Sequence, residues 1–241
     1  MKHLKFLAVI CLAAGTSFAV SSCNSAEEKK ADEKPADSSL VKAPDPMAAK
    51  PVYLSVMMHK VSNFSKWLKG YEAGDSLRLS HGVHNFVLAR GVQDTNMVMV
   101  AVKVDDTARA SQFMALPDLK AAMQKAGVIG APTISMLDVQ MQDTTTNTSS
   151  IRLMVTHKVK DWAAWKGVFD GNQAERTNAG LSDRLLAYHV GDNHAVTIVF
   201  LVSDMKKAED FTKSPGLKAR MEAGGVDGPP GLFYYTIAKK Y

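Results

Sequence analysis

From residue 51 onward, the chain alternates between stretches typical of strands and stretches typical of helices. Residues 52–59 form an apolar, partly β-branched run that ends in a polar residue, which predicts a strand. Asn63 follows as a natural helix N-cap. Four apolar residues then recur at helical spacing: Phe64, Trp67, Leu68 and Tyr71. The pattern therefore predicts a strand followed by a helix that ends near Gly82.

The next stretch completes one structural unit. Residues 83–89 and 97–104 indicate two strands joined by a turn around Asp94. A helix with a proline interruption is predicted over residues 106–126, because proline cannot donate a backbone hydrogen bond. A glycine-rich loop then leads to a last strand over residues 133–139. The predicted order, β-α-β-β-α-β, is that of the ferredoxin-like unit.

The whole unit occurs twice. When the chain is shifted by 98 positions, His59-Lys60-Val61 aligns with His157-Lys158-Val159, and Trp67 aligns with Trp165. Roughly 24 of about 80 positions agree without a gap, which marks a tandem duplication.

The alignment also places the boundaries of the two copies. The first copy covers residues 51–141, the second covers residues 151–241, and the polar residues 142–150 link them. The second copy has its helix N-cap at Asp161, its hairpin turn at residues 191–193 and its last strand at residues 232–238. One ferredoxin-like unit leaves a whole sheet face exposed, and a second unit in the same chain can cover it. We therefore predict an α+β fold in which the chain carries its own dimer partner.

The first residues have the layout of a secretory signal. Lys2 and Lys5 form a basic start, and residues 6–14 form an apolar run that is too short to span a bilayer. The segment ends in Val20-Ser21-Ser22-Cys23, which resembles a bacterial lipobox. That resemblance implies removal of residues 1–22 and acylation of the Cys23 thiol and its new amine. The alternative is an ordinary cleaved signal with an incidental cysteine.

Residues 23–50 are expected to tether the folded part to this anchor. They are polar, mixed in charge and punctuated by prolines, so they cannot bury enough apolar surface to fold. As a coil they would reach roughly 30 Å. Glu27 and Glu28 resemble the acidic export signal of some Bacteroidetes surface lipoproteins, with a solvated linker as the alternative. The expected location is the cell envelope, as an outer-membrane lipoprotein that faces either the periplasm or the cell surface.

Composition narrows the chemistry. The chain has two cysteines, of which Cys11 lies in the signal and Cys23 would carry lipid, so no disulfide, thiol nucleophile or cysteine-based metal site is left. The formal net charge of +5 falls to +3 when Lys2 and Lys5 leave with the signal. This charge is too weak and too dispersed to predict nucleic-acid binding. The expected partner is the membrane, through the lipid.

Three motifs of the duplicated unit are shared with a known superfamily. They are the His-Lys-Val-x-(Asn/Asp)-aromatic-x-x-Trp start, the Arg and Gly that close the first helix, and the Gly-Val-x-Gly-x-Pro loop. Over residues 51–140 and 151–238 the chain resembles the dimeric α+β barrel superfamily, and the antibiotic biosynthesis monooxygenase-like group is its nearest named relative. The resemblance implies two tandem ferredoxin-like repeats that face each other as a pseudo-dimeric barrel, with pockets between each sheet and its own helices. The superfamily includes cofactor-free monooxygenases, haem-degrading enzymes, stress-induced proteins and members without known activity.

His59 and His157 are the first candidate site residues. Each ends the first strand of its copy, where a neutral imidazole could act as a base or proton shuttle near pH 7. Neither histidine has an obvious partner in the sequence. The alternative is therefore a histidine that caps the following turn or bonds a backbone carbonyl.

Aromatic and arginine side chains complete the candidate set. The aromatic candidates for a ligand pocket are Trp67, Tyr71, Trp165 and Phe169. Their spacing also fits plain packing of a helix on a sheet. Arg78 and Arg176 could bind an anionic group of a ligand, pair with a carboxylate such as Asp94, or cap a helix end.

No metal site and no cofactor are predicted. The chain lacks a nucleophile elbow, a Walker loop and a paired-cysteine metal site. Haem binding is an alternative in which His189 or His194 could be an axial ligand. These two residues flank the second hairpin turn and are expected to face each other across it.

These features predict a lipid-anchored, extracytoplasmic protein whose duplicated barrel binds a small hydrophobic or aromatic molecule or another partner. The family resemblance adds the alternative of a cofactor-independent monooxygenase-like enzyme that acts on an aromatic substrate. In that alternative the histidines would serve as the base, the tryptophans would shape the pocket, and the arginines would orient an anionic group. The sequence leaves open whether the protein is an enzyme.

Overall fold

The computed structural model describes residues 51–146 and 149–241. The predicted signal peptide, the Cys23 lipid site and the tether lie outside the described residues. Within the described part of the chain, none of the helices is long and apolar enough to cross a membrane.

Both repeats contain four strands and four helices in the same order. Repeat 1 consists of β1 (Val52–Val61), α1 (Phe64–Ala73), α2 (Asp75–Ser80), β2 (Val83–Gly91), β3 (Met97–Val104), α3 (Thr107–Met114), α4 (Pro117–Ala126) and β4 (Val128–Gln142). Repeat 2 consists of β5 (Ile151–Val159), α5 (Trp162–Gly171), α6 (Gln173–Asn178), β6 (Leu181–His189), β7 (Asp192–Val202), α7 (Met205–Thr212), α8 (Pro215–Ala223) and β8 (Val226–Lys240). The predicted β-α-β-β-α-β order is present twice, and each predicted helix is divided into two.

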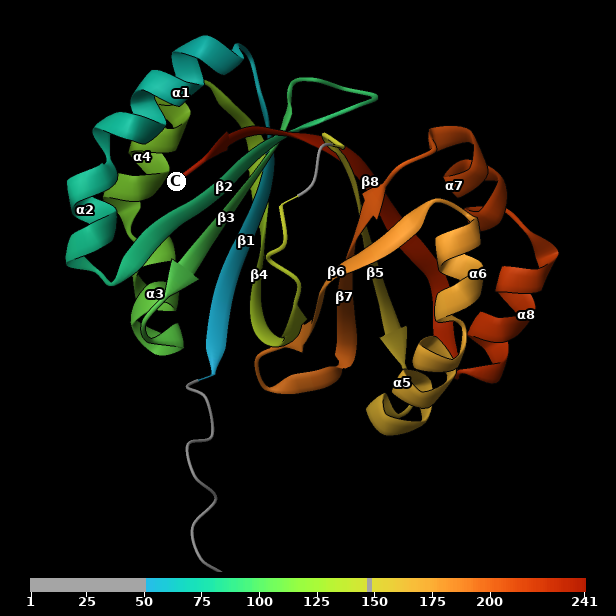
Figure 1. The fold of residues 1–241 in the computed structure, drawn as a ribbon. Coiled ribbons are helices and arrows are strands. Elements are labelled where there is room, and N and C mark those ends of the chain that lie inside the picture. Colours follow the sequence, from blue (N-terminus) through green and yellow to red (C-terminus); the bar gives the residue numbers. More distant parts are fainter. Residues whose placement is uncertain (1–50, 147–148) are drawn as a thin grey trace, which may run out of the picture. The chain divides into compact units, whose positions relative to one another are not determined.

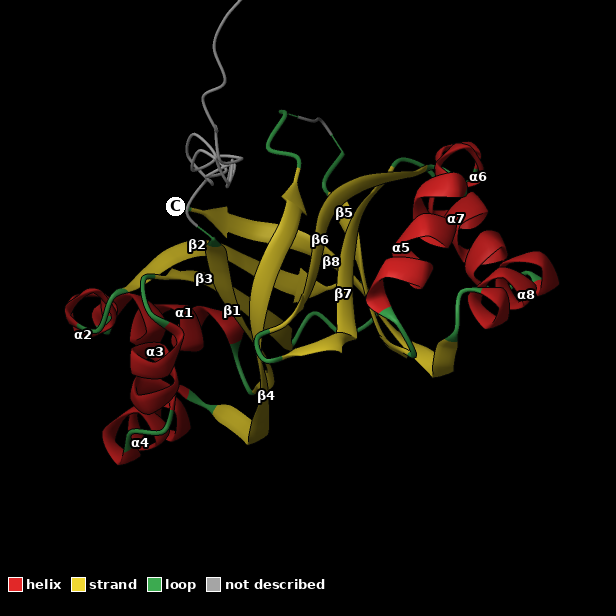
Figure 2. Cartoon of the chain, turned by 90° about the horizontal axis from the view of Figure 1, so that it is seen from below, coloured by secondary structure: helices red, strands yellow, loops and turns green. Residues whose placement is uncertain are grey.

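The eight strands close into one barrel. Around it they follow the order β1-β3-β2-β8-β5-β7-β6-β4, and β4 pairs with β1 to close the ring. Two antiparallel joints connect the repeats, β2 with β8 and β4 with β6. Figure 1 shows α1 to α4 on one side of the strands and α5 to α8 on the opposite side, and Figure 2 shows the same layers from below. The predicted fold class, two ferredoxin-like repeats in an intrachain pseudo-dimeric α+β barrel, is confirmed.

Side-chain caps begin the first helix of each repeat, as the sequence predicted. The Asn63 side chain accepts a hydrogen bond from the Lys66 backbone N–H (2.8 Å), and the Asp161 side chain accepts one from Ala164 (2.7 Å). Each helix is then divided before its predicted end, at Gly74 in repeat 1 and at the equivalent position in repeat 2. The short second segment carries Arg78 in repeat 1 and Arg176 in repeat 2. Their side chains reach Asn85 of β2 and Asp183 of β6.

The last strand of each repeat starts earlier than predicted. β4 already pairs with β1 at Val128, where the sequence predicted a glycine-rich loop. The additional residues form a bulge, because the pairing shifts at His59 and Gly130 takes a positive φ of 74°. The same shift occurs at His157 between β5 and β8, where Gly228 has a φ of 75°. On the side of β4 or β8 each histidine therefore lies opposite a bulge, and on its other side it pairs regularly, His59 with Val98 and His157 with Val196.

Each strand contributes to two separate interiors because successive side chains point to opposite faces. On β1, Ser55, Met57 and His59 face the helices of repeat 1, whereas Leu54 and Val56 point into the barrel. The described residues form three apolar clusters, one beneath each group of helices and one inside the barrel. The fold therefore offers two kinds of internal space, between sheet and helices and within the barrel.

We expect Gly180→Ala to lower the free energy of unfolding by about 1–2 kcal/mol. Gly180 joins α6 to β6 with a φ of 75°, and an added Cβ would lie 3.1 Å from atoms of Asp204 and Ser203. The control is Gly167→Ala in helix α5, where an added Cβ meets nothing within 4 Å. That change should raise the free energy of unfolding by roughly 0.5–1 kcal/mol. Denaturant titration measures both, and equal stability of the Gly180→Ala protein and its parent would contradict the left-handed turn.

Candidate functional site

Two equivalent pockets lie between the barrel and the helices, one in each repeat. We call them the sheet–helix pockets, with volumes of about 110 Å³ in repeat 1 and about 100 Å³ in repeat 2. Equivalent residue pairs line them: Ser55 and Leu153, Met57 and Val155, His59 and His157, Trp67 and Trp165, Tyr71 and Phe169, Arg78 and Arg176. The structure thus brings the predicted histidine, aromatic and arginine candidates of each repeat together.

The two histidines lie in these pockets without a hydrogen-bond partner. Within the described part of the chain, neither ring nitrogen of His59 or His157 bonds any other group. The His59 residue is 4% exposed, and its ring centroid lies 5.5 Å from that of Trp67; the equivalent distance from His157 to Trp165 is 5.3 Å. The alternative in which the rings cap a turn or bond a backbone carbonyl is therefore wrong.

Burial sets the charge of these histidines. It lowers the pKa of His59 from 6.5 to about 4, and it lowers the pKa of His157 to about 4 as well. Both rings are therefore neutral imidazoles at pH 7. Each offers one N–H donor and one acceptor nitrogen toward its pocket.

The aromatic residues both pack and line the pockets. Trp67 stacks on Tyr71 with ring centroids 5.3 Å apart, and Trp165 stacks on Phe169 at 5.1 Å. These pairs are four residues apart on one helix face, which is the spacing that brings side chains together. Both tryptophans are almost fully buried. The two readings offered by the sequence, core packing and a pocket wall, thus describe the same side chains.

Arg78 is held by groups of its own repeat. Its guanidinium lies 3.8 Å above the Tyr71 ring, Nε donates to the Asn85 side chain (3.0 Å), and Nη1 donates to the Tyr71 carbonyl (2.7 Å). The carboxylate that pairs with Arg78 is Asp75 at 3.4 Å, whereas Asp94, the example suggested by the sequence, pairs with Lys60 at 2.8 Å. Asp94 lies in the turn between β2 and β3, beside the end of β1 and away from α2.

Arg176 is held in the same way, with a carboxylate in place of the amide. Its Nε and Nη2 donate to the two carboxylate oxygens of Asp183 at 2.9 and 2.7 Å, and Nη1 donates to the Phe169 carbonyl. The guanidinium lies 3.6 Å above the Phe169 ring. This bidentate pair joins α6 to β6. In both pockets the arginine therefore positions the walls, and its hydrogen-bonding groups already have partners.

The two pockets differ in polarity. In repeat 1 the Tyr71 hydroxyl donates to Asn85 (2.6 Å), and the buried Ser55 hydroxyl has no partner among the described residues. Repeat 2 has Phe169 and Leu153 at the equivalent places. Asn85 and Asp183 were missed in the sequence, although their equivalent positions after the first helix could have marked them as partners of the arginines.

The predicted haem ligands do not face each other. In the hairpin between β6 and β7, His189 pairs with Asp192 across a two-residue turn, so His194 lies further along β7. The His194 ring Nδ1 lies 3.0 Å from the Val159 carbonyl oxygen. Across residues 51–146 and 149–241, no three His, Cys, Asp or Glu side chains gather as a metal site.

Comparison with known proteins identifies the fold. No protein-family model matches the chain, and no curated protein matches it. Among solved structures, a candidate monooxygenase from Fusobacterium nucleatum subsp. nucleatum is 14% identical, with a TM-score of 0.52 over 80% of this chain and 94% of that chain. An anthrone oxidase-like protein is 11% identical, with a TM-score of 0.52 over 79% of this chain and 92% of that chain.

A third solved structure, a candidate chlorite dismutase, is 12% identical, with a TM-score of 0.51 over 78% of this chain and 95% of that chain. At these identities the likeness concerns the fold alone. The resemblance to monooxygenase-like proteins of the dimeric α+β barrel fold is thereby confirmed at the level of the fold.

We expect the free energy of unfolding to fall as the pH drops from about 6.5 to about 4. The unfolded chain binds a proton at each of His59 and His157 in this range and the folded chain does not, so acid favours unfolding. The loss should reach about 3 kcal/mol per histidine. Denaturant titrations at pH 7 and pH 4.5 measure it. His59→Leu and His157→Leu should each remove about half of the histidine-dependent slope, and an unchanged slope in the double variant would contradict neutral, buried rings.

Proposed function

We propose that the protein binds a small aromatic molecule with a polar substituent in its sheet–helix pockets. The observation that carries this proposal is the pair of histidines that line the two pockets and whose buried ring nitrogens have no hydrogen-bond partner among the described residues. Buried polar groups are nearly always hydrogen-bonded, and leaving one unpaired costs about 1–3 kcal/mol. A ligand that supplies the missing hydrogen bond would remove this cost.

Size and surface indicate the class of ligand. The pockets have about 100–110 Å³, while an apolar cavity of about 150 Å³ is known to hold benzene. The pockets are therefore smaller than that cavity, so a single aromatic ring is the largest planar group expected to enter, with a small outward movement of the walls. Trp67 and Trp165 line the pockets beside such a molecule. The neutral imidazole can accept a hydrogen bond from a hydroxyl or donate one to a carbonyl.

A monooxygenase-like activity is the second candidate function, and the neutral state of the histidines favours it. In that function the neutral imidazole would act as the base toward a bound phenol-type hydroxyl, and its pKa of about 4 requires a substrate hydroxyl that is itself acidic. The shared fold of proteins named as candidate monooxygenases supports this as an analogy between folds. Haem binding gains no support from the described residues, since the His194 ring bonds a backbone carbonyl.

We further propose that the barrel is held at the cell envelope by lipid on Cys23. The support is in the sequence: a basic start, a short apolar run and the Val20-Ser21-Ser22-Cys23 segment. The polar residues 24–50 would then separate the barrel from the membrane surface. A membrane location suits an apolar aromatic ligand, because such molecules concentrate in lipid.

Phenol should bind at least about fivefold more tightly than toluene. The two molecules have similar size, and only phenol can satisfy the His59 or His157 ring, with a hydrogen bond worth about 1 kcal/mol. The indole N–H signals of Trp67 and Trp165 in NMR titrations report each pocket separately.

The double variant His59→Leu/His157→Leu should bind phenol and toluene equally. Ser55→Leu, which gives repeat 1 the residue of repeat 2, is the matched control and should leave the phenol preference at His59 in place. Equal binding of the two probes by the unaltered protein, or no shift of either indole signal, would contradict the proposal. Oxygen consumption with a hydroquinone, lost in the double variant, would favour the enzyme.

The full-length chain made in a lipoprotein-processing bacterium should carry fatty acid on Cys23. Mass spectrometry of the purified protein should find the chain beginning at Cys23 with added acyl groups, and Cys23→Ala should abolish both the acylation and the membrane association. Cys11→Ala is the control, because Cys11 lies within the expected signal, and it should change neither result. A mature protein that lacks acyl groups would refute the anchor while leaving the ligand proposal intact.

A further inference from the structure

A separate cavity of about 320 Å³ lies inside the barrel, at the end where β4 stops and β5 begins. It is distinct from the sheet–helix pockets, because it is lined by the opposite faces of the same strands. Its apolar walls are Leu54, Val56, Met99, Leu137, Met154 and Val199. Its volume falls within the range of ligand sites, at the lower end. We call it the lumen cavity.

A second cavity of about 330 Å³ lies toward the other end of the barrel. The two cavities share Val56, Leu137, Met154 and Thr197, and the second is also lined by polar Thr133, Ser135 and His189. A flexible, elongated molecule can use such a space better than a rigid ring can. The lumen cavity is therefore suited to a chain-like apolar group.

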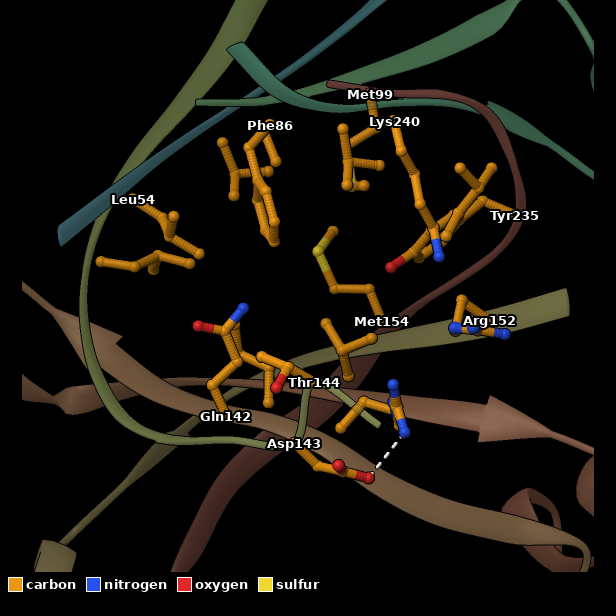
Figure 3. A pocket seen from close by; sticks show the side chains of 18 of the residues that line it. Leu54, Phe86, Met99, Gln142, Asp143, Thr144, Arg152, Met154, Tyr235 and Lys240 are labelled. Atoms are coloured by element: carbon orange, nitrogen blue, oxygen red, sulfur yellow. Dashed lines mark hydrogen bonds and ion pairs between the residues drawn. The ribbon is translucent and has the colours of Figure 1, made fainter. Parts of the chain in front are cut away.

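The two repeats contribute opposite chemistry to the mouth of the lumen cavity. Equivalent positions carry Leu54 and Arg152, Phe86 and Arg184, Leu137 and Tyr235, Gln142 and Lys240. At these four paired positions repeat 1 has three apolar residues and one amide, whereas repeat 2 has three cations and one hydroxyl; repeat 2 also adds apolar Met154 and Val199 to the wall. Figure 3 shows this division, with Leu54 and Phe86 across the cavity from Arg152, and with Lys240 directed inward beside Tyr235.

Arg152 is a buried cation without a counter-charge. The residue is 6% exposed, and its Nη1 donates to the backbone carbonyls of Ser149 (2.7 Å) and Ile151 (3.1 Å). Among the described residues, its Nε and Nη2 groups have no partner and no carboxylate pairs with it. Burial and the neighbouring Arg184 lower its pKa from the usual value. A buried charge in this state is strongly unfavourable unless an anion joins it.

The neighbouring cations differ in their partners. Arg184 is neutralised by Asp143 at 2.6 Å, as Figure 3 shows with a dashed line. Lys240 has no carboxylate partner among the described residues and is exposed at the rim. Two cations, Lys240 at the surface and Arg152 inside, therefore mark a route from solvent to the buried guanidinium.

We propose that the lumen cavity binds an aliphatic carboxylate, with its chain in the barrel and its carboxylate on Arg152. The free Nε and Nη2 groups lie on one edge of the guanidinium, and two parallel N–H donors match the two oxygens of one carboxylate. The Tyr235 hydroxyl and the Lys240 ammonium lie at the same mouth, where each can donate a further hydrogen bond to the carboxylate oxygens.

The test uses decanoate, with decan-1-ol and decyl phosphate as comparison ligands, in titration calorimetry on the purified protein. Decanoate should bind at least tenfold more tightly than decanol. Arg152→Leu, which installs the residue found at the equivalent position 54, should weaken decanoate binding about 10- to 100-fold and leave decanol binding unchanged. This variant removes an unpaired buried charge, so its folding should be at least as stable as that of the parent.

Two further variants keep the test specific. Arg152→Lys retains the positive charge but loses the pair of parallel N–H donors of the guanidinium. Its affinity for decanoate should lie between those of the parent and of Arg152→Leu. Lys206→Leu, on the exposed face of α7, removes the same charge elsewhere and should leave binding unchanged. Equal affinity of the parent and Arg152→Leu for decanoate, equal affinity for decanol and decanoate, or absence of binding would overturn the proposal. Tighter, Arg152-dependent binding of decyl phosphate would overturn the choice of a carboxylate.

This site stands apart from the proposed aromatic site. His59→Leu/His157→Leu should bind decanoate as the parent does, and Arg152→Leu should keep its preference for phenol over toluene. Failure of one proposal would therefore leave the other measurable.

Discussion

The structure depends on the two joints at which strands of one repeat pair with strands of the other, β2 with β8 and β4 with β6. A ferredoxin-like sheet alone would expose one apolar face and two unpaired edges, and edges of this kind invite aggregation. Closing the ring removes both problems in one step. It also creates the lumen, because the strand faces that point away from the helices now line the inside of the barrel.

Covalent duplication adds a freedom that a homodimer lacks. In a symmetric dimer each residue occurs twice about the axis, so an arginine at the position of Arg152 would face its own copy across a narrow lumen. Here the equivalent residue is Leu54, and the like-charge repulsion is avoided. The same freedom lets Asn85 serve in repeat 1 where Asp183 serves in repeat 2, and it leaves one sheet–helix pocket more polar than the other.

The two kinds of site use buried polar groups in contrasting ways. Arg78 and Arg176 are fully bonded within their repeats, so they stabilise the walls around the pockets. The histidine rings beside them are neutral and unbonded, and Arg152 is charged and only partly bonded. A ligand gains most binding free energy at buried polar groups that lack hydrogen-bond partners. The ligand supplies the hydrogen bond that these groups lost when folding removed them from water.

The sequence by itself determined the repeat, the order of its strands and helices, and the caps at Asn63 and Asp161, since these depend on local pattern and on comparison of the chain with itself. It also placed the histidines, tryptophans and arginines together, because they share one face of a strand and a helix. The bulges at His59 and His157, the partners of the arginines and the pairing of His189 came only from the tertiary structure. Each depends on which residue of a distant strand lies opposite. The local sequence pattern does not determine this register between strands. The position of Arg152 inside the lumen likewise came only from the tertiary structure, because it depends on closure of the barrel.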